Sequence, residues 1–242
     1  MFRCIIQSGH VNIKYNSIVD LRNKTGAPGE QDFTLRIANR LSEILRSKGF
    51  EIKQSDANSN DDKSITEKDW DLFLSIHYDA DSPNGQGGCV GSADPSLDDA
   101  TVESTRIRDA MRSEYFKHTG IVGNNAKIGV NITRYYMWQY LTAKTPCVLI
   151  ECGEGKDPHD SVILADTDRV CNAIARGICK AFGINFDTQP APQPSEPMAT
   201  ITRKYLDVLR LERDKNYSLW QAARDLNIQL QLKIDKAKEI LK

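Results

Sequence analysis

Apolar residues along the chain form short continuous runs that alternate with longer periodic stretches. Five short runs predict buried strands, at Arg3–Gln7, Glu51–Gln54, Leu72–His77, Gly88–Ser92 and Cys147–Glu151. Three stretches with apolar residues at helical spacing predict helices, at Glu30–Lys48, Asp99–His118 and Asp160–Phe182. This alternation is typical of α/β proteins, so we predict a largely parallel or mixed central sheet flanked by helices.

The pattern changes after residue 186. Four prolines fall between residues 190 and 197, and they favour an extended backbone, so residues 187–199 are predicted to be a linker. Residues 200–242 then carry an apolar stripe at helical spacing from Leu219 to Leu241, which predicts a small α-helical C-terminal region. Such a stripe needs a partner surface, which could be residues 201–212, the domain of residues 1–186 or a second copy of the chain.

Charge and composition exclude several classes of protein. The chain has 242 residues and a net charge of −1, which argues against a dedicated nucleic-acid binder. The balance is uneven, because the segment from Ala199 carries ten basic and six acidic residues, a net charge of +4. No transmembrane segment and no secretory signal pattern is found, so we expect synthesis and retention in the cytoplasm. The six scattered cysteines predict reduced, buried thiols.

Metal-binding side chains gather at the predicted strand ends. His10 and His77 each follow a strand, Glu151 lies near the end of another, and Glu30 stands at the start of the first long helix. Ligands collect beyond the carboxyl ends of parallel strands. Two imidazoles and one carboxylate with an open fourth position suit a catalytic zinc ion, and a further carboxylate suits a general base. Two alternatives remain open: Glu30 complementing the helix N-terminus, and Glu151 pairing with a core arginine.

Four sequence blocks in this order carry a resemblance. They are "SGH", "GAPGEQDFTLRIANRLSEILRSKGFEI", "SIHYDA" followed by "GQGG", and "TPCVLIECG". Together they resemble the zinc-dependent N-acetylmuramoyl-L-alanine amidases, a family that includes bacterial wall-remodelling amidases and phage endolysins. The resemblance implies one Zn²⁺ ion held by His10, Glu30 and His77, with Glu151 as the catalytic glutamate. The implied reaction is hydrolysis of the amide between N-acetylmuramic acid and L-alanine in bacterial peptidoglycan.

The chain departs from the family pattern near these blocks. Val11 and Asn12 stand where the family has two glycines, and Tyr78 and Asp79 stand where small and amide residues are common. After Glu151 the chain reads "CGEGKDPHD" in place of a glycine–aromatic continuation. None of these positions is an expected ligand, but all of them are expected to line the cleft.

Four further candidate sites are better explained by structural roles than by functional ones. His118 is expected to stabilise a helix C-terminus, and His159 is expected at the surface. The aromatic cluster of residues 134–141 is expected to pack in the core with tyrosine hydroxyls at its rim, the alternative being stacking on substrate. Cys152 resembles a nucleophile only in its position beside Glu151.

The expected function is therefore that of a peptidoglycan amidase, in particular a phage endolysin made in the host cytoplasm and acting on the wall after release. Its basic C-terminal region is expected either to bind the wall or to form a homodimer. Two alternatives are a zinc metallopeptidase of another specificity on the same scaffold and a non-catalytic wall-binding module.

Overall fold

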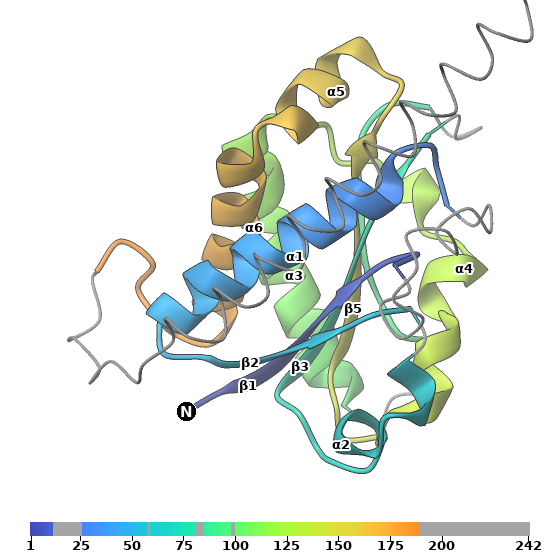
Figure 1. The fold of residues 1–242 in the computed structure, drawn as a ribbon, viewed down its shortest axis with the longest axis vertical. Coiled ribbons are helices and arrows are strands. Elements are labelled where there is room, and N and C mark those ends of the chain that lie inside the picture. The colour runs from blue at the N-terminus through green and yellow to red at the C-terminus, as the bar shows by residue number, and fades with distance from the viewer. Residues whose placement is uncertain (12–25, 58, 81–84, 98–99, 189–242) are drawn as a thin grey trace, which may run out of the picture. The chain divides into compact units, whose positions relative to one another are not determined.

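A five-stranded sheet forms the centre of the computed structural model, which describes residues 1–11, 26–57, 59–80, 85–97 and 100–188. The strands are β1 (Arg3–Ser8), β2 (Glu51–Ser55), β3 (Leu72–Asp79), β4 (Cys89–Ser92) and β5 (Cys147–Glu154), in the order β2-β1-β3-β5-β4 (Figure 1). Strands β2, β1, β3 and β5 are parallel, and β4 pairs with β5 in the antiparallel sense. The predicted α/β class and all five predicted strands are confirmed.

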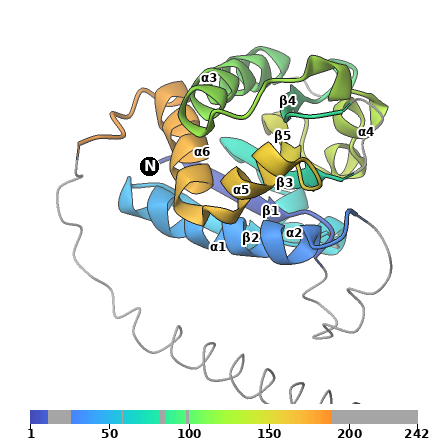
Figure 2. The same cartoon turned by 90° about the horizontal axis from the view of Figure 1, so that it is seen from above.

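Four longer helices accompany the sheet. They are α1 (Glu30–Ser47), α3 (Thr101–Thr119), α5 (Pro158–Ala165) and α6 (Thr167–Ala181). Figure 2 shows α1, α6 and α3 on one side of the sheet and α4 on the other. The core on the opposite face takes residues from three short elements, α2 (Lys63–Thr66), α4 (Val130–Thr133) and the 3-10 turn η4 (Tyr136–Tyr140). Two further 3-10 turns are η2 (Ser59–Asp61) and η3 (Asn125–Lys127).

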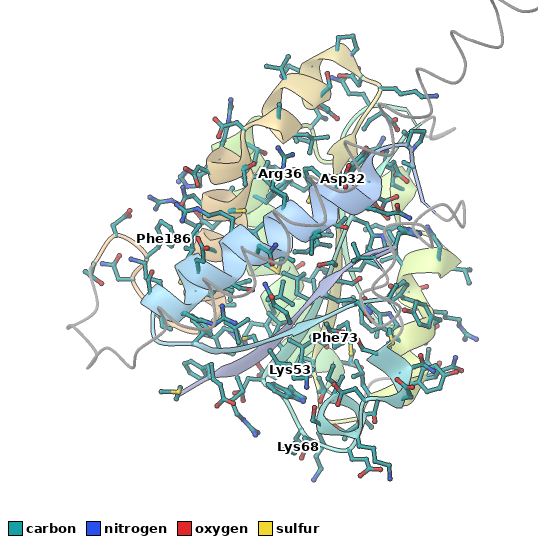
Figure 3. The ribbon with its side chains drawn as sticks, in the orientation of Figure 1. Asp32, Arg36, Lys53, Lys68, Phe73 and Phe186 are labelled. Atoms are coloured by element: carbon teal, nitrogen blue, oxygen red, sulfur yellow. The ribbon has the colours of Figure 1, made fainter. Side chains whose placement is uncertain are left out.

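Two apolar cores lie on the two faces of the sheet. Side chains alternate along a strand, so Cys4 and Ile6 of β1 pack in the core under α1 and α6, whereas Ile5 packs in the other. Phe73 of β3, labelled in Figure 3, meets Trp138 of η4 edge to face in that second core, with ring centroids 5.8 Å apart. Toward the carboxyl ends of the strands, the second face becomes polar, and the candidate site lies there.

The predicted helix at Asp160–Phe182 was wrong, because the structure has two helices, α5 and α6, in that stretch. Asp166 separates them with a non-helical backbone, and its side chain accepts a hydrogen bond from the amide of Arg169. An aspartate in this position satisfies an amide at the start of the second helix, so it favours a new helix over a continued one.

Three other predictions concern the cysteines, membrane-spanning helices and the C-terminal region. All six cysteines are buried and free, as predicted. Among the described residues, the helices are too short or too polar to cross a bilayer. The predicted helical region of residues 200–242, and all but the first two residues of the predicted linker, lie outside the described residues.

Candidate metal centre and active site

The first candidate ligand, His10, follows β1 in a left-handed backbone conformation, with a φ of 59°. Such a φ is uncommon for residues other than glycine, and it turns the imidazole back toward the neighbouring strand end. Gly9 makes the approach possible, because a Cβ atom there would lie 2.4 Å from the His77 ring. The Gly9 amide also donates a hydrogen bond to the Ile76 carbonyl at 3.0 Å, which joins the ends of β1 and β3.

The second candidate ligand, Glu30, is the first residue of α1 and is buried. Its Oε2 accepts a hydrogen bond from the Ala27 amide at 2.7 Å, and its Oε1 accepts one from the Tyr78 amide at 3.2 Å. The Thr34 hydroxyl, one turn further along α1, donates to the Gly9 carbonyl at 2.8 Å. The start of α1 is therefore tied directly to the end of β1, and Glu30 is aimed at the histidines.

These residues form one group. The His77 Nδ1 lies 3.0 Å from Glu30 Oε1, and the His10 Nε2 lies 3.6 Å from the same oxygen. One ligand atom from each residue lies within 4.8 Å of the others, and the two imidazole rings meet edge to face. Two imidazole nitrogens and a carboxylate oxygen are a donor set that catalytic zinc takes in proteins, so the residues fit the metal.

The electrostatics of the group also suit a cation. Burial acts to raise the pKa of Glu30, but the hydrogen bond from His77 and the nearby imidazoles lower it below the usual value overall. Burial lowers the pKa of His10, more than the charge of Glu30 raises it. A charged carboxylate beside a neutral imidazole is the protonation state in which both groups bind a metal ion.

Glu151 lies beside this group on β5, as the direct cross-strand neighbour of His77. The residue is buried, and its Oε2 has no hydrogen-bond partner among the described residues. Burial raises the pKa of Glu151 well above its usual value, and the charges of Asp79 and Glu30 raise it further. A carboxylate with a raised pKa next to a metal-ligand group is a candidate for proton transfer.

A buried ion pair network adjoins Glu151. The Lys127 Nζ lies 3.2 Å from Asp79 Oδ2 and 3.2 Å from Glu154 Oε2, with 1% of the Lys127 side chain exposed. Asp79 and Glu154 meet because the β3–β5 register shifts after His77, so that β5 carries one extra residue. The bulge thus brings two of the unusual positions of the sequence together around one lysine.

Tyr78 accounts for another unusual position. Its ring packs edge to face on Phe33 with centroids 4.9 Å apart, and its hydroxyl donates to the Pro28 carbonyl at 2.5 Å. Tyr78 also lines a cavity of about 420 Å³ between α1 and α5, together with Asp32 and Arg36, which Figure 3 labels on α1. Since neighbouring side chains of a strand alternate, the cavity lies against the face of β3 opposite to that of His77.

The remaining candidates have structural surroundings. The His118 Nε2 lies 3.2 Å from Glu114 Oε2 on α3, and the His159 Nδ1 lies 3.1 Å from Asp160 Oδ1. Asp160 also accepts hydrogen bonds from the amides of Gly87 and Glu154, so its carboxylate is held by the fold. Cys152 is buried in the core on the opposite face of β5 from Glu151, and burial raises its pKa.

Two residues near His77, Gln7 and Ser75, were not among the predicted candidates, and Tyr135 was one only as part of the cluster at 134–141. The Ser75 hydroxyl lies 3.0 Å from His77 Nε2 and donates to Gln7 Oε1 at 2.7 Å. The Tyr135 hydroxyl donates to the same Gln7 oxygen at 3.0 Å, and its ring stands edge-on to His77. Polar residues within the otherwise apolar runs "CIIQS" and "LFLSIH" were the available signal. The cluster at 134–141 therefore packs in the core through Trp138 and also supports the site through Tyr135.

The ligand group at the carboxyl edge of a mostly parallel sheet, with a buried glutamate beside it, places the protein among α/β metal-dependent hydrolases. The family model described as N-acetylmuramoyl-L-alanine amidase matches residues 5–182. The chain belongs to this family, and the resemblance seen in the sequence is confirmed.

Several known proteins are similar to this chain. An N-acetylmuramoyl-L-alanine amidase of Mycobacterium tuberculosis is 24% identical over 171 residues, which cover 62% of this chain and 67% of the relative. The crystal structure of the amidase Ami1 from Mycobacterium smegmatis has a TM-score of 0.59 at 23% identity, covering 75% of this chain and 97% of that one. The amidase AmiC2 of Nostoc punctiforme gives a TM-score of 0.55 at 20% identity, with coverages of 75% and 97%. These structures share the fold of this chain.

Proposed function

We propose that His10, Glu30 and His77 hold one zinc ion and that Glu151 is the general base of the amidase. The observation that carries this proposal is the ligand group of His10, Glu30 and His77 beside the buried, unpartnered Oε2 of Glu151. The substrate is the amide that joins the lactyl group of N-acetylmuramic acid to L-alanine in peptidoglycan, as the family assignment implies.

The roles of the residues follow from their positions. When bound, zinc lowers the pKa of a coordinated water and polarises the scissile carbonyl. Glu151 takes a proton from the attacking water at its free Oε2 and returns it to the leaving amine of L-alanine. The rigid strand pairing with His77 keeps the base next to the ligand group.

The test is digestion of purified peptidoglycan with product analysis, before and after removal of metal by a chelator and again after addition of zinc. We expect new L-alanine N-termini without new reducing sugars, lost with the chelator and restored with zinc. Zinc-bound protein that leaves peptidoglycan intact but cleaves small peptides would assign the same site to the rival metallopeptidase. Zinc-bound protein that binds the wall and cleaves neither substrate would support the non-catalytic module.

We further propose that the enzyme is a phage endolysin that is made in the host cytoplasm and degrades the wall after release. The amidase chemistry supports this proposal, because cleavage of the stem-peptide attachment dissolves the wall. Bacteria that express the protein should stay intact until their inner membrane is permeabilised, and should then lyse. Lysis without permeabilisation would contradict cytoplasmic retention.

The role proposed for residues 200–242 is wall binding or self-association. The net charge of +4 supports binding to anionic wall polymers, and the apolar stripe from Leu219 to Leu241 supports a homodimer. A monomer by light scattering that loses wall binding on deletion of residues 199–242 would favour wall binding. Concentration-dependent dimers that Leu226→Asp and Leu230→Asp abolish would favour self-association.

A further inference from the structure

We propose that Gln7 and Ser75 are positioning residues that hold His77 in one tautomer, with Nε2 protonated and Nδ1 free to bind the metal. The proposal rests on the metal site proposed above. It concerns a row of hydrogen bonds behind His77, on the side of the ring away from Glu30. The row runs from the Asp56 carbonyl through Gln7 and Ser75 to His77 Nε2.

The direction of each hydrogen bond is fixed by the one before it. A backbone carbonyl can only accept, so the Gln7 side-chain nitrogen must face the Asp56 carbonyl, 3.0 Å away. This sets Gln7 Oε1 toward Ser75 Oγ at 2.7 Å, where two acceptors need a hydrogen between them. The Ser75 hydroxyl supplies its single hydrogen to Gln7. Its oxygen can then only accept from His77 Nε2, 3.0 Å away.

Because these side chains are buried, water cannot offer them alternative hydrogen bonds. Gln7 and Ser75 have no exposed surface, and His77 is 5% exposed. The Tyr135 hydroxyl donates to Gln7 Oε1 at 3.0 Å, so this oxygen receives two hydrogens and the amide is held against a flip. Reversing the Gln7 amide would place its oxygen against the Asp56 carbonyl, so that two acceptors would face each other.

The fixed tautomer has a consequence on the other side of the ring. With Nε2 protonated, the lone pair of neutral His77 is on Nδ1, which lies 3.0 Å from Glu30 Oε1. A metal ion between these two atoms would take the place of the proton that joins them in a hydrogen bond, and His10 Nε2 faces the same oxygen at 3.6 Å. The row of hydrogen bonds therefore prepares Nδ1 as the ligand atom of His77. Outer partners of metal-binding histidines typically change metal affinity by about 10- to 100-fold when removed.

The test uses Ser75→Ala, which removes the acceptor that faces His77 Nε2–H among the described residues. Its matched control is Ser42→Ala, because Ser42 has the same zero exposure and its hydroxyl donates to the Ala38 carbonyl within α1. Zinc affinity is measured by competition with a chromophoric chelator on full-length, metal-free protein. Ser75→Ala should bind zinc about 10- to 100-fold more weakly than wild type. Ser42→Ala should bind zinc like wild type.

A spectroscopic readout separates positioning from general stability. Nitrogen NMR of histidine-labelled, zinc-loaded wild type should show His77 with a protonated Nε2 and a metal-bound Nδ1. Gln7→Met leaves the Ser75 hydroxyl without its main acceptor, so it should also weaken zinc binding and speed hydrogen exchange at Nε2. This second variant keeps the test valid if Ser75→Ala does not fold.

The outcomes distinguish this inference from the proposed function. A Ser75→Ala variant with wild-type zinc affinity, or a metal-bound Nε2 in wild type, would overturn the role of the row. Wild-type protein that does not bind one zinc ion per chain would instead overturn the metal site itself. Equal losses of zinc affinity in Ser75→Ala and Ser42→Ala would show a general effect of deleting a buried hydroxyl, and would also overturn the inference.

Discussion

Replacement of Glu151 by glutamine separates metal binding from catalysis. Glu151 is not among the three residues whose ligand atoms converge, so Glu151→Gln should retain one zinc ion per chain. The glutamine has the same shape but cannot accept the proton of the attacking water. Loss of a general base reduces turnover by about 10²- to 10⁴-fold, so we expect a loss of that size in peptidoglycan cleavage.

The same substitution predicts a pH-dependent change in the stability of the metal-free protein. Burial and the charges of Asp79 and Glu30 raise the pKa of Glu151 in the folded state above its usual value near 4.5. Above that pH the unfolded chain loses a proton that the folded state keeps, so the free energy of unfolding of wild type falls as pH rises. The slope is at most about 1.4 kcal/mol per pH unit, and the glutamine variant lacks it.

Urea unfolding between pH 4 and pH 8, with chelator present, measures both free energies of unfolding. The advantage of Glu151→Gln over wild type should be smallest at pH 4 and grow toward neutral pH. Glu67→Gln is the control, because that carboxylate is exposed and pairs with Lys63 on the surface. Parallel curves for wild type and Glu151→Gln would refute the raised pKa, and near-wild-type cleavage by Glu151→Gln would refute its role as base.

Three more substitutions test the site by other routes. His10→Ala and His77→Ala should each lose both bound zinc and cleavage, and metal analysis that still finds one zinc per chain would exclude the mutated residue as a ligand. Gly9→Ala should also weaken zinc binding, because its Cβ would press on the His77 ring, whereas a Cβ at Gly129 would meet only the end of a flexible side chain. Equal zinc affinity in the two glycine variants would contradict that packing argument. Lys127→Met should lower the free energy of unfolding by about 3–5 kcal/mol, since it removes a buried cation that lies 3.2 Å from each of two carboxylates. A loss below about 1 kcal/mol in urea unfolding would show that the pair network is solvated.

The sequence was informative where chemistry and strand pattern coincide. His10, Glu30 and His77 could be placed together because each stands where a strand ends or a helix begins, and parallel strands end at one edge. The break at Asp166 was missed because the apolar periodicity continues across it. The structure shows the break in the non-helical backbone of Asp166 and in the hydrogen bond that its side chain accepts from the Arg169 amide. Gln7 was missed for a different reason: its role depends on contacts with strands and loops far along the chain.

The departures from the family pattern form coherent structural units. Asp79 and Glu154 would repel each other if buried alone, but the β-bulge brings both to the same buried Lys127. Two substitutions that look independent in the sequence are thus parts of one ion pair network. Tyr78 is similarly accommodated, through its ring contact with Phe33 and its hydrogen bond to the Pro28 carbonyl. These contacts involve residues next to the ligands and not the ligands themselves, so the group of His10, Glu30 and His77 stays together beside them.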